Sequence, residues 1–308
     1  MQQPWSMSTF RAMASPCRVI APDAAVVAEA EALVHRLEAL WSRFDPSSEI
    51  SRLNRTNGEL TIVSAETFEL VSLAEWARTA TCGIYNPLML SQLCTAGYDA
   101  SWEHIRDSSD NPVGCIAASN EPIELFADVC GVRLPKGVEF DPGGIGKGLA
   151  ADMVARRLAV MGAASSQIEL GGDVRLSGPN WHGGNWDVTV DDREHDRREA
   201  ASITIPYGGV ATSSSTRRSW QRGRTRMHHL LDPSTGRPAV TDLASATVVA
   251  PTLWWAEVVA KVVVIEGSRR GRRRLEDLSM SGVLVARGEH ADRYTAIETM
   301  DTERVGAR

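Results

Sequence analysis

A glycine-rich stretch in the middle of the chain holds the residues best suited to bind an anion. Asp141 precedes Gly143 and Gly144, and Lys147 follows where an apolar pattern of helical period begins. The free N–H groups and dipole of a helix start favour negative charge, and Lys147 adds a full positive charge. Asp141 would repel a phosphate unless it accepts hydrogen bonds from a ligand base or supports a cation. The stretch predicts a phosphate-binding loop; the alternative is a tight turn with a solvated Lys147.

Two further pairs of polar residues stand in turn-forming or apolar segments. His229 and Asp232 bracket two leucines where a strand is expected to end, so both could point into one pocket; a structural histidine is the alternative. Glu257 and Lys261 lie four residues apart in an apolar helix, where they share a face and can pair. An exposed pair of this kind contributes only about 0.3 to 0.5 kcal/mol. Their apolar surroundings favour a position facing a cleft.

The helices that must position these residues are predicted from hydrophobic periodicity. Residues 24–40 carry apolar side chains at helical spacing, and Ser64 is a good N-cap for a second helix that ends near residue 79. A short strand should lead into the glycine loop, and a helix should follow the loop. A strongly apolar helix is expected over residues 253–265. The arginine-rich residues 269–274 should form the solvated face of a further helix.

Strands and connections are predicted between these helices. Strands are expected over residues 10–20, 167–170, 174–176, 186–190, 201–205, 209–212 and 246–250, with hairpin-like pieces over residues 123–126 and 129–134. Residues 41–54 should form a polar, turn-prone stretch, residues 101–120 a loop or weak insertion, and residues 194–199 a charged surface connection. The hydroxyl-rich residues 213–218 suit a phosphate, but they equally suit an ordinary solvated loop.

The composition is that of a globular protein and argues against several classes. The 308 residues, 43% hydrophobic and 23% charged, can bury a sizeable core as one large or two small domains. A formal net charge of −6 gives no overall basic field for nucleic acid or anionic lipid. The apolar residues 258–265 are too few to span a bilayer. We therefore expect no nucleic acid partner and no membrane insertion.

The cysteines indicate the compartment. The chain has five, Cys17, Cys82, Cys94, Cys115 and Cys130, which are widely spaced and have no nearby histidine pair. Their odd number and spacing argue against a disulfide framework and against a zinc site. Buried thiols in a reducing compartment are the expected state. Because residues 1–15 also lack a basic region followed by a long apolar run, a cytoplasmic protein is predicted.

Eight short motifs occur in order along nearly the whole chain. They are Phe-Arg-Ala-Met at residues 10–13, the polar segment 42–54, Gly-Ile-Tyr-Asn-Pro at 83–87, the glycine loop 141–147, Leu-Gly-Gly-Asp at 170–173, Ala-Thr-Ser at 211–213, the His-to-Gly turn 229–236 and residues 247–264. Together these motifs resemble the FAD:protein FMN transferases of the ApbE type. Each motif alone is weak, whereas eight in register are specific.

The resemblance implies a fold, an activity and partners. The implied fold is α+β, of the T-fold-like ApbE type, with mixed and antiparallel sheets, flanking helices and a smaller accessory subdomain. Residues 1–308 would form a single ApbE-like domain of two lobes with an FAD cleft between them. The implied transferase cleaves FAD and attaches FMN by a phosphoester bond to a threonine or serine of a partner flavoprotein, and it releases AMP. FAD is then the substrate, and Mg²⁺ is the implied cofactor.

Carried over residue by residue, the resemblance implies the positions that contact FAD. They are Met13, Phe44, Ile84, Tyr85, Asn86, Asp141, Lys147 and His229. The residues alone leave the role of Phe44 open, because an aromatic ring there could stack on a ligand ring or plug the core. Tyr85 and Asn86 follow a glycine on a loop, where a planar ligand could be clamped.

The implied magnesium site departs from the family pattern. Its positions fall on the Gly144 carbonyl, Glu257 and Lys261, where the family has Asp in place of Glu257 and Thr in place of Lys261. Glutamate can still bind magnesium, but a protonated lysine cannot ligate a metal. Either the Lys261 ammonium partly replaces the metal, or it pairs with Glu257 and leaves the site empty. Asn86 in place of Asp also removes one carboxylate.

The expected chemistry is attack by a hydroxyl on the FMN phosphorus. Lys147, the loop N–H groups and any cation near Glu257 would neutralise charge on the pyrophosphate. His229, held by Asp232 or a backbone group, would accept the hydroxyl proton. The alternative is an FAD-binding protein or FAD pyrophosphatase that has lost FMN transfer because the metal site is altered. A serine hydrolase on residues 213–215 is disfavoured, because no Gly-x-Ser-x-Gly elbow is present.

Overall fold

Two units are distinguished in the computed structural model, which describes residues 5–110, 116–192, 197–288, 294–297 and 305–307. The sheet unit comprises Met1–His35, Lys147–Thr216 and Val240–Arg308, and the helical unit comprises Arg36–Gly146 and Arg217–Ala239. Cys115 and residues 194–196 of the expected charged connection lie outside the described residues.

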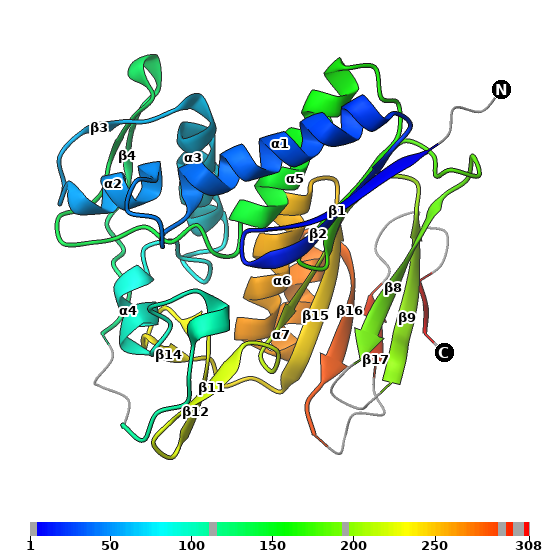
Figure 1. Cartoon of the computed structure of the whole chain (residues 1–308). Helices are drawn as coiled ribbons and strands as arrows, with labels where there is room; N and C mark the ends of the chain where they lie inside the picture. The colour runs from blue at the N-terminus through cyan, green and yellow to red at the C-terminus, as the bar shows by residue number, and fades with distance from the viewer. Residues whose placement is uncertain (1–4, 111–115, 193–196, 289–293, 298–304, 308) are drawn as a thin grey trace. The chain divides into compact units, whose positions relative to one another are not determined.

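An eight-stranded antiparallel sheet forms the centre of the sheet unit (Figure 1). In order across the sheet its strands are β1 (Ser6–Ala12), β2 (Ser15–Ala21), β6 (Ser166–Leu170), β7 (Asp173–Ser177), β10 (Gly208–Ser214), β15 (Leu243–Ala250), β16 (Ser281–Ala286) and β17 (Tyr294–Ile297). Along β2, buried and exposed residues alternate, as expected for a strand with one covered face. β15 is buried along most of its length, which fits its central place.

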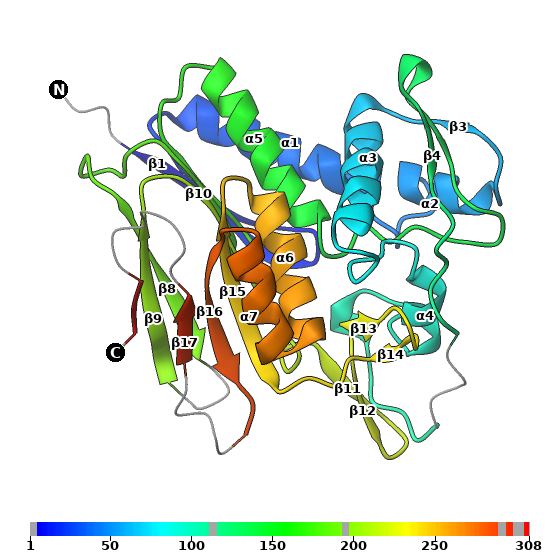
Figure 2. The same cartoon turned by 180° about the vertical axis from the view of Figure 1, so that it is seen from behind.

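Helices cover one face of this sheet. α6 (Leu253–Glu266) packs against β10 and β15 and also contacts α7 (Ser268–Asp277) (Figure 2). α6 is apolar on nearly all sides, which is typical of a buried helix. α5 (Gly146–Val160) is tied to the sheet by an ion pair of 2.8 Å between Arg175 Nε and Asp152 Oδ1. α1 (Ala24–Trp41) is held to β1 where Ser8 Oγ donates to the Glu31 carboxylate at 2.7 Å.

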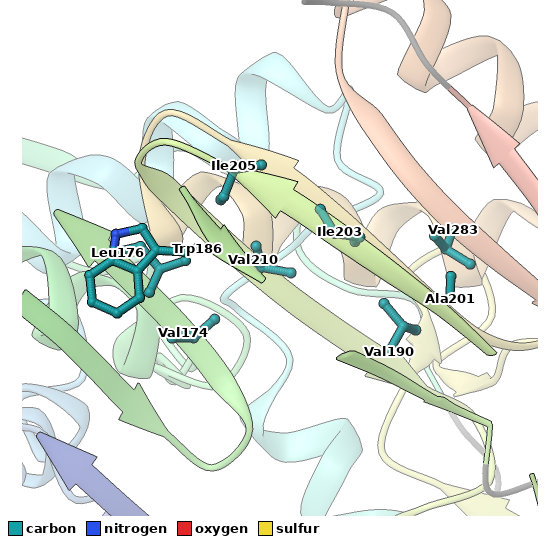
Figure 3. Close-up of a cluster of buried hydrophobic side chains, with 9 residues drawn as sticks. All are labelled: Val174, Leu176, Trp186, Val190, Ala201, Ile203, Ile205, Val210 and Val283. Carbon is teal, nitrogen blue, oxygen red and sulfur yellow. The ribbon is translucent and has the colours of Figure 1, made fainter. Parts of the chain in front are cut away.

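The opposite face of the sheet is covered by the hairpin of β8 (Trp186–Asp192) and β9 (Arg197–Ile205), to which β18 (Val305–Ala307) is added. Figure 3 shows the buried side chains of this interface: Val174, Leu176, Val210 and Val283 from the sheet, and Trp186, Val190, Ala201, Ile203 and Ile205 from the hairpin. Full burial of one large apolar side chain stabilises the fold by about 1.5 to 3 kcal/mol. This packing fixes β7 and β10, which carry Asp173 and Thr212.

The helical unit is built from short elements. Its helices are α2 (Glu49–Arg55), α3 (Ala65–Ala80), α4 (Leu90–Thr95) and the 3₁₀ turns η1 (Trp102–His104) and η2 (Ala127–Val129). One small sheet consists of β3 (Thr61–Ile62), β5 (Gly131–Arg133) and β4 (Glu124–Phe126). Two further sheets have two strands each. The first pairs β11 (Ser219–Arg222) with β12 (Thr225–His228), and the second pairs β13 (Leu231–Asp232) with β14 (Arg237–Pro238). Met89, Leu93, Trp220, Met227 and Leu231 are buried together in its core.

The predicted helices are confirmed. Residues 24–40 lie in α1, and the apolar residues 253–265 lie in α6. Ser64 is the N-cap of α3, where its hydroxyl accepts a hydrogen bond of 3.2 Å from the Thr67 N–H. α7 carries four arginines of the cluster on its exposed side, whereas Arg274 is half-buried and pairs with Glu266 at 2.6 Å, and Leu275 is buried. The predicted strands in the second half of the chain and the hairpin of β4 and β5 are also present.

Several local predictions are wrong. Residues 10–20 form two strands joined by a tight turn instead of one, and the turn-prone segment 41–54 contains α2, which Ser48 caps by accepting from the Ser51 N–H at 3.0 Å. The expected strand before the glycine loop is missing from the described residues; instead the Asn54 amide exchanges two hydrogen bonds with the backbone of Phe140. The charged connection also extends less far than expected, because residues 197–199 belong to β9.

Two negative findings concern the described residues only. The cysteines within them, Cys17, Cys82, Cys94 and Cys130, are all free thiols. In the same part of the chain, every helix is too short or too polar to traverse a lipid bilayer.

Candidate active site

The sheet unit brings three charged side chains from three elements into one cluster. The Nζ atom of Lys147, at the start of α5, lies 2.6 Å from Asp173 Oδ2 on β7 and 2.8 Å from Glu257 Oε1 on α6. The two carboxylates are nearly buried, whereas the Lys147 side chain keeps 20% of its surface exposed. We call Lys147, Asp173 and Glu257 the lysine cluster. It unites the glycine-loop lysine with the acidic residue of the apolar helix.

Backbone N–H groups complete the hydrogen bonding of both carboxylates. Glu257 Oε2 accepts from the Gly148 N–H at 2.8 Å, and Asp173 Oδ1 accepts from the Thr212 N–H at 3.0 Å. Each of the four carboxylate oxygens therefore has a donor within hydrogen-bond distance. Charge-assisted hydrogen bonds of this kind are shorter and stronger than neutral ones, so the cluster is held rigidly.

Burial and neighbouring charges shift the pKa of Lys147 in opposite directions. Burial by itself would lower the pKa of the ammonium, whereas the negative charges of Asp173 and Glu257 and their hydrogen bonds raise it. The attraction outweighs burial, so the pKa of Lys147 lies above its ordinary value. The cluster consequently contains a cation that stays protonated at neutral pH.

Close contacts between α5 and α6 set this geometry. A Cβ atom on Gly148 would lie 2.6 Å from the Cα of Trp254, so only glycine allows the two helix starts to approach this closely. Asp152 of α5 also caps α6, because its carboxylate accepts from the Leu253 N–H at 3.1 Å and from the Trp254 N–H at 2.9 Å. These contacts bring Glu257, about one turn into α6, beside Lys147.

The turn between β1 and β2 lies against the same cluster. Met13 and Ala14 form a two-residue turn with φ of 51° and 52°, in the left-handed region that non-glycine residues seldom adopt. A Cβ atom on Gly171 would lie 2.9 Å from Ser15 Oγ and 3.4 Å from Lys147 Cδ, so this turn, the turn between β6 and β7, and Lys147 are neighbours. Strained backbone of this kind concentrates at functional sites. Contact of Met13 with FAD stays a prediction.

The residues predicted to hold magnesium do not fit that ion as they stand. Both oxygens of Glu257 accept hydrogen bonds from α5, one from Lys147 and one from Gly148. Lys261 is half-buried one turn further along α6 and has no lone pair while protonated. Gly144 belongs to the helical unit. Over the described ranges, no three His, Cys, Asp or Glu side chains gather as metal ligands would, whereas Mg²⁺ requires near-octahedral oxygen ligands.

In the helical unit, one arginine contacts two aromatic rings and a carboxylate. The Arg43 guanidinium lies 4.3 Å from the ring centroid of Phe44 and 4.8 Å from that of Tyr98. Its Nε atom lies 3.2 Å from Asp141 Oδ1, and its Nη2 donates to the Tyr98 carbonyl at 2.8 Å. We call Arg43, Phe44 and Tyr98 the arginine stack. Phe44, predicted to contact FAD, keeps 42% of its surface exposed although Arg43 lies over its ring, and its contact with FAD stays a prediction.

The negative charge of Asp141, in the glycine loop, is offset by an ion pair. Asp141 is nearly buried, its carboxylate pairs with Arg43, and its N–H donates to the Pro87 carbonyl at 2.8 Å. Gly144 lies in the turn that follows, which is closed by a 2.9 Å hydrogen bond from the Gly146 N–H to the Pro142 carbonyl. Because Arg43 offsets its charge, Asp141 repels a phosphate less than a free carboxylate would.

The segment predicted to clamp a planar ligand is buried in the helical unit. Ile84 is half-buried, Tyr85 has no exposed surface and Asn86 is 6% exposed. The Asn86 amide donates to the Ser119 carbonyl at 3.0 Å and accepts from the Leu88 N–H at 2.9 Å, which fixes the loop. The ring of Tyr85 contributes to the core of this unit, and FAD contacts of this segment stay predictions.

His229 lies between β12 and β13, next to the arginine stack. Its half-buried ring is 6.5 Å from the Tyr98 ring in an edge-on arrangement. The Asp232 carboxylate accepts from the Ser234 N–H at 2.8 Å and from the Ser234 hydroxyl at 2.7 Å. Asp232 therefore stabilises the turn after β13. The coupling of His229 to Asp232 and the proton-accepting role of His229 remain predictions.

Sequence reasoning missed two residues that organise these groups. Asp173 had a signal, because it is an acidic residue directly after two glycines in the Leu-Gly-Gly-Asp motif. Arg43 had none beyond its place beside an aromatic residue, because its partners Tyr98 and Asp141 lie far along the chain.

Comparison with known proteins points to one family. The sequence profile of the ApbE family matches residues 1–284. A curated relative from Vibrio cholerae, named FAD:protein FMN transferase, is 28% identical over 239 residues, which cover 75% of this chain and 70% of the relative.

Solved structures of this family share the fold. The crystal structure of an ApbE protein from Thermotoga maritima is similar with a TM-score of 0.86 and 24% identity, over 98% of this chain and 100% of that one. The flavin transferase ApbE from Vibrio cholerae is similar with a TM-score of 0.79 and 20% identity, over 97% of this chain and 99% of that one. The predicted α+β fold is therefore confirmed.

Proposed function

The chain belongs to the ApbE family, and from this premise we propose that it transfers FMN from FAD to a protein. The name of the Vibrio cholerae relative, FAD:protein FMN transferase, supports this function. The single observation within the fold that carries the proposal is the lysine cluster, which holds a rigid, partly exposed cation at the start of α5. A fixed positive charge is what a pyrophosphate substrate requires.

The proposed reaction breaks one bond and forms one. The hydroxyl oxygen of a threonine or serine in an acceptor flavoprotein forms a bond to the FMN phosphorus of FAD. The bond between that phosphorus and the bridging oxygen breaks, and AMP leaves with the electron pair. The hydroxyl proton passes to a base on the enzyme, so that the products are the FMN phosphoester and AMP.

The residues of the chain divide into roles for this reaction. Lys147 stabilises charge on the bridging oxygen, and His229 accepts the hydroxyl proton, since its reference pKa is near neutrality. Asp232 supports the turn that follows His229. The FAD-binding positions are those implied by the resemblance: Met13, Phe44, Ile84, Tyr85, Asn86, Asp141, Lys147 and His229. Their arrangement as two lobes of one domain around an FAD cleft is part of this proposal.

Magnesium has no part in the proposed mechanism. The positions implied for it, Gly144, Glu257 and Lys261, include a lysine that cannot act as a ligand, and the carboxylate of Glu257 already accepts two hydrogen bonds from α5. The chemistry that magnesium would supply, charge neutralisation at the pyrophosphate, is assigned to side chains of the chain itself.

A second candidate function is favoured by the same departures. A chain whose metal site is altered could bind FAD without transferring FMN, or could hydrolyse FAD to FMN and AMP with water as the acceptor. Release of AMP without covalent flavin would support hydrolysis, and bound flavin without AMP would support simple binding.

The compartment and the partners complete the proposal. Free thiols in the described part of the chain support a reducing compartment, and we place the protein in the cytoplasm. The proposed partner is an acceptor flavoprotein with a target threonine or serine, with neither nucleic acid nor membrane insertion involved. The net charge of −6 supports the exclusion of nucleic acid.

The decisive experiment combines the chain with FAD and candidate acceptor flavoproteins. Transfer predicts that the intact mass of one acceptor increases by FMN less one water, and that AMP appears in equal amount by chromatography. An acceptor variant with alanine at the target residue should gain no mass. Absence of both covalent flavin and AMP, with FAD bound, would leave only the binding function.

A further inference from the structure

In the lysine cluster, every carboxylate oxygen accepts a hydrogen bond, whereas the Lys147 ammonium uses only part of its donors within the described residues. A lysine has three N–H donors. Within the described residues, the hydrogen bonds of Lys147 use two of them, one to Asp173 and one to Glu257. The Lys147 side chain is 20% exposed, while those of Asp173 and Glu257 are 7% and 8% exposed. The third donor of Lys147 is therefore the polar group that the cluster offers to an anion.

From this arrangement we propose that the Lys147 ammonium, fixed between Asp173 and Glu257, is the cation that neutralises the FAD pyrophosphate in this chain, in place of a divalent metal ion. The inference rests on the proposed function, because it names the group that acts on that substrate. Lys147 is then a catalytic residue. Asp173 acts through Lys147 and is a positioning residue.

Before FAD binds, the charges of the four side chains cancel without a metal ion. Asp173 and Glu257 contribute two negative charges, and Lys147 and Lys261 contribute two positive charges. Lys261 follows Glu257 by four residues on α6, so the two share a helix face. A divalent ion at Glu257 would have to displace Lys147 and would meet the repulsion of Lys261. Lys261 thus adds a second positive charge on the face of α6 that carries Glu257.

The use of lysine in this chain is selective. Its 33 basic residues include only three lysines, Lys136, Lys147 and Lys261, and the others are arginines. A lysine is a compact point charge on a flexible stem, whereas arginine is a planar fork that needs more room. The narrow space between Asp173 and Glu257, with donor–acceptor distances of 2.6 and 2.8 Å, suits the compact ammonium.

The ammonium acts on the bond that breaks. As the bond between the FMN phosphorus and the bridging oxygen lengthens, negative charge builds on the leaving AMP phosphate. The third N–H of Lys147 donates a hydrogen bond to an oxygen of that pyrophosphate and keeps its proton throughout. Asp173 and Glu257 hold the ammonium in place, so no reorganisation is needed at the moment of reaction.

The test measures metal binding and turnover separately on the full chain. After metal removal with EDTA and gel filtration, Mn²⁺ is titrated and followed by electron paramagnetic resonance, with and without FAD, and against FAD alone. AMP release is then measured in EDTA and in Mg²⁺. We expect the unaltered chain to bind no Mn²⁺ beyond that held by FAD, and its AMP release to change less than twofold.

Two variants make the test specific. The double variant Glu257→Asp with Lys261→Thr introduces the residues that the resemblance implies at these positions and is expected to bind one Mn²⁺ per chain. Lys136→Thr removes the same charge at an exposed position and is expected to bind none. One Mn²⁺ bound by the unaltered chain with FAD, a tenfold loss of AMP release in EDTA, or equal Mn²⁺ binding by both variants would overturn the inference. If no AMP appears under any condition, the proposed function fails, while the Mn²⁺ titration still decides the metal question.

Discussion

Each unit of the chain contains a cation held by acidic residues, and the two cations differ in their other partners. In the sheet unit, the Lys147 ammonium lies within 2.8 Å of two carboxylates that come from other elements. In the helical unit, the Arg43 guanidinium meets one carboxylate, Asp141, at 3.2 Å and spreads over the rings of Phe44 and Tyr98. Both cations are held by acidic residues, but only Arg43 is also held by aromatic faces.

The difference teaches what each unit can bind. A compact ammonium with a spare donor suits a phosphate oxygen, whereas a planar guanidinium stacked on aromatic rings suits the edge or face of a heterocycle. We therefore expect a phosphate group at the lysine cluster and an aromatic ring at the arginine stack. Substitutions in the two groups of residues should then differ in kind: those in the lysine cluster should lower the rate, and those in the arginine stack should lower the affinity for FAD.

The largest effect is expected from Lys147→Ala. Removal of the cation leaves the developing charge of the leaving group unopposed, and comparable cations in phosphoryl transfer contribute about 10³-fold or more to the rate. FMN transfer at saturating FAD should fall by that factor, measured as AMP release over time. The melting temperature must be measured beside it, because Asp173 and Glu257 would then face each other without their shared partner. A fully folded variant with an unchanged rate would contradict the assignment.

The next largest effect is expected from His229→Ala. Loss of a general base lowers the rate by about 100-fold or more, because the acceptor hydroxyl keeps its proton. The matched control is the neighbouring His228→Ala, since the buried His228 ring lies 3.3 Å from the Ala239 carbonyl and has a packing role. Transfer to an acceptor should discriminate the two variants, with stability reduced only at His228. Equal transfer rates would remove His229 from the proton-accepting role.

A smaller effect is expected from Asp173→Asn. The amide keeps the shape of the side chain but loses the charge-assisted hydrogen bond to Lys147, which is worth about 1.5 to 3 kcal/mol, so the rate should fall about tenfold or somewhat more. The affinity for FAD, followed by flavin fluorescence, should change little. Asp173→Glu should recover part of the rate if the residue positions the ammonium. A loss of folding without any change of rate in the folded fraction would show a purely structural role.

The smallest effect is expected from Phe44→Ala in the helical unit. Phe44 is 42% exposed, so its removal should leave the fold intact while one stacking partner of an FAD ring is lost. A stacking contact worth about 0.5 to 1.5 kcal/mol predicts an FAD dissociation constant raised about five-fold. The rate at saturating FAD should stay within twofold of that of the unaltered chain. A large fall in this rate with unchanged affinity would contradict the assignment of the arginine stack to FAD binding.

The fold was predictable wherever the local pattern matched the final environment. The apolar period of α1 and the N-cap of α3 are local signals, and the structure follows them. The segment before the glycine loop was predicted wrongly, because a short apolar run resembles a strand. In the structure the side chain of Asn54, which is distant in sequence, supplies the hydrogen bonds to the Phe140 backbone that a strand partner would make. The turn at Met13 was hidden as well, since left-handed φ values at Met and Ala contradict the usual preference.

The candidate site was predictable in its residue types but not in its pairing. Glu257 and Lys261 were recognised as anomalies in an apolar helix, and helical spacing suggested that they pair. The structure adds two partners that the sequence did not predict, because the Glu257 carboxylate accepts hydrogen bonds from Lys147 and Gly148. That choice depends on the close approach of α5 to α6, which Asp152 and Gly148 determine through tertiary contacts. Spacing along one helix carries no information about such contacts.

One measurement tests the division between the lysine cluster and the arginine stack most directly: the single-turnover rate of FMN transfer at saturating FAD, compared between Lys147→Ala and Phe44→Ala. The account predicts a rate about 10³-fold lower or more for Lys147→Ala, and a rate within twofold of the unaltered chain for Phe44→Ala once FAD saturates it. Equal rates in the two variants, or a greater loss in Phe44→Ala, would contradict it.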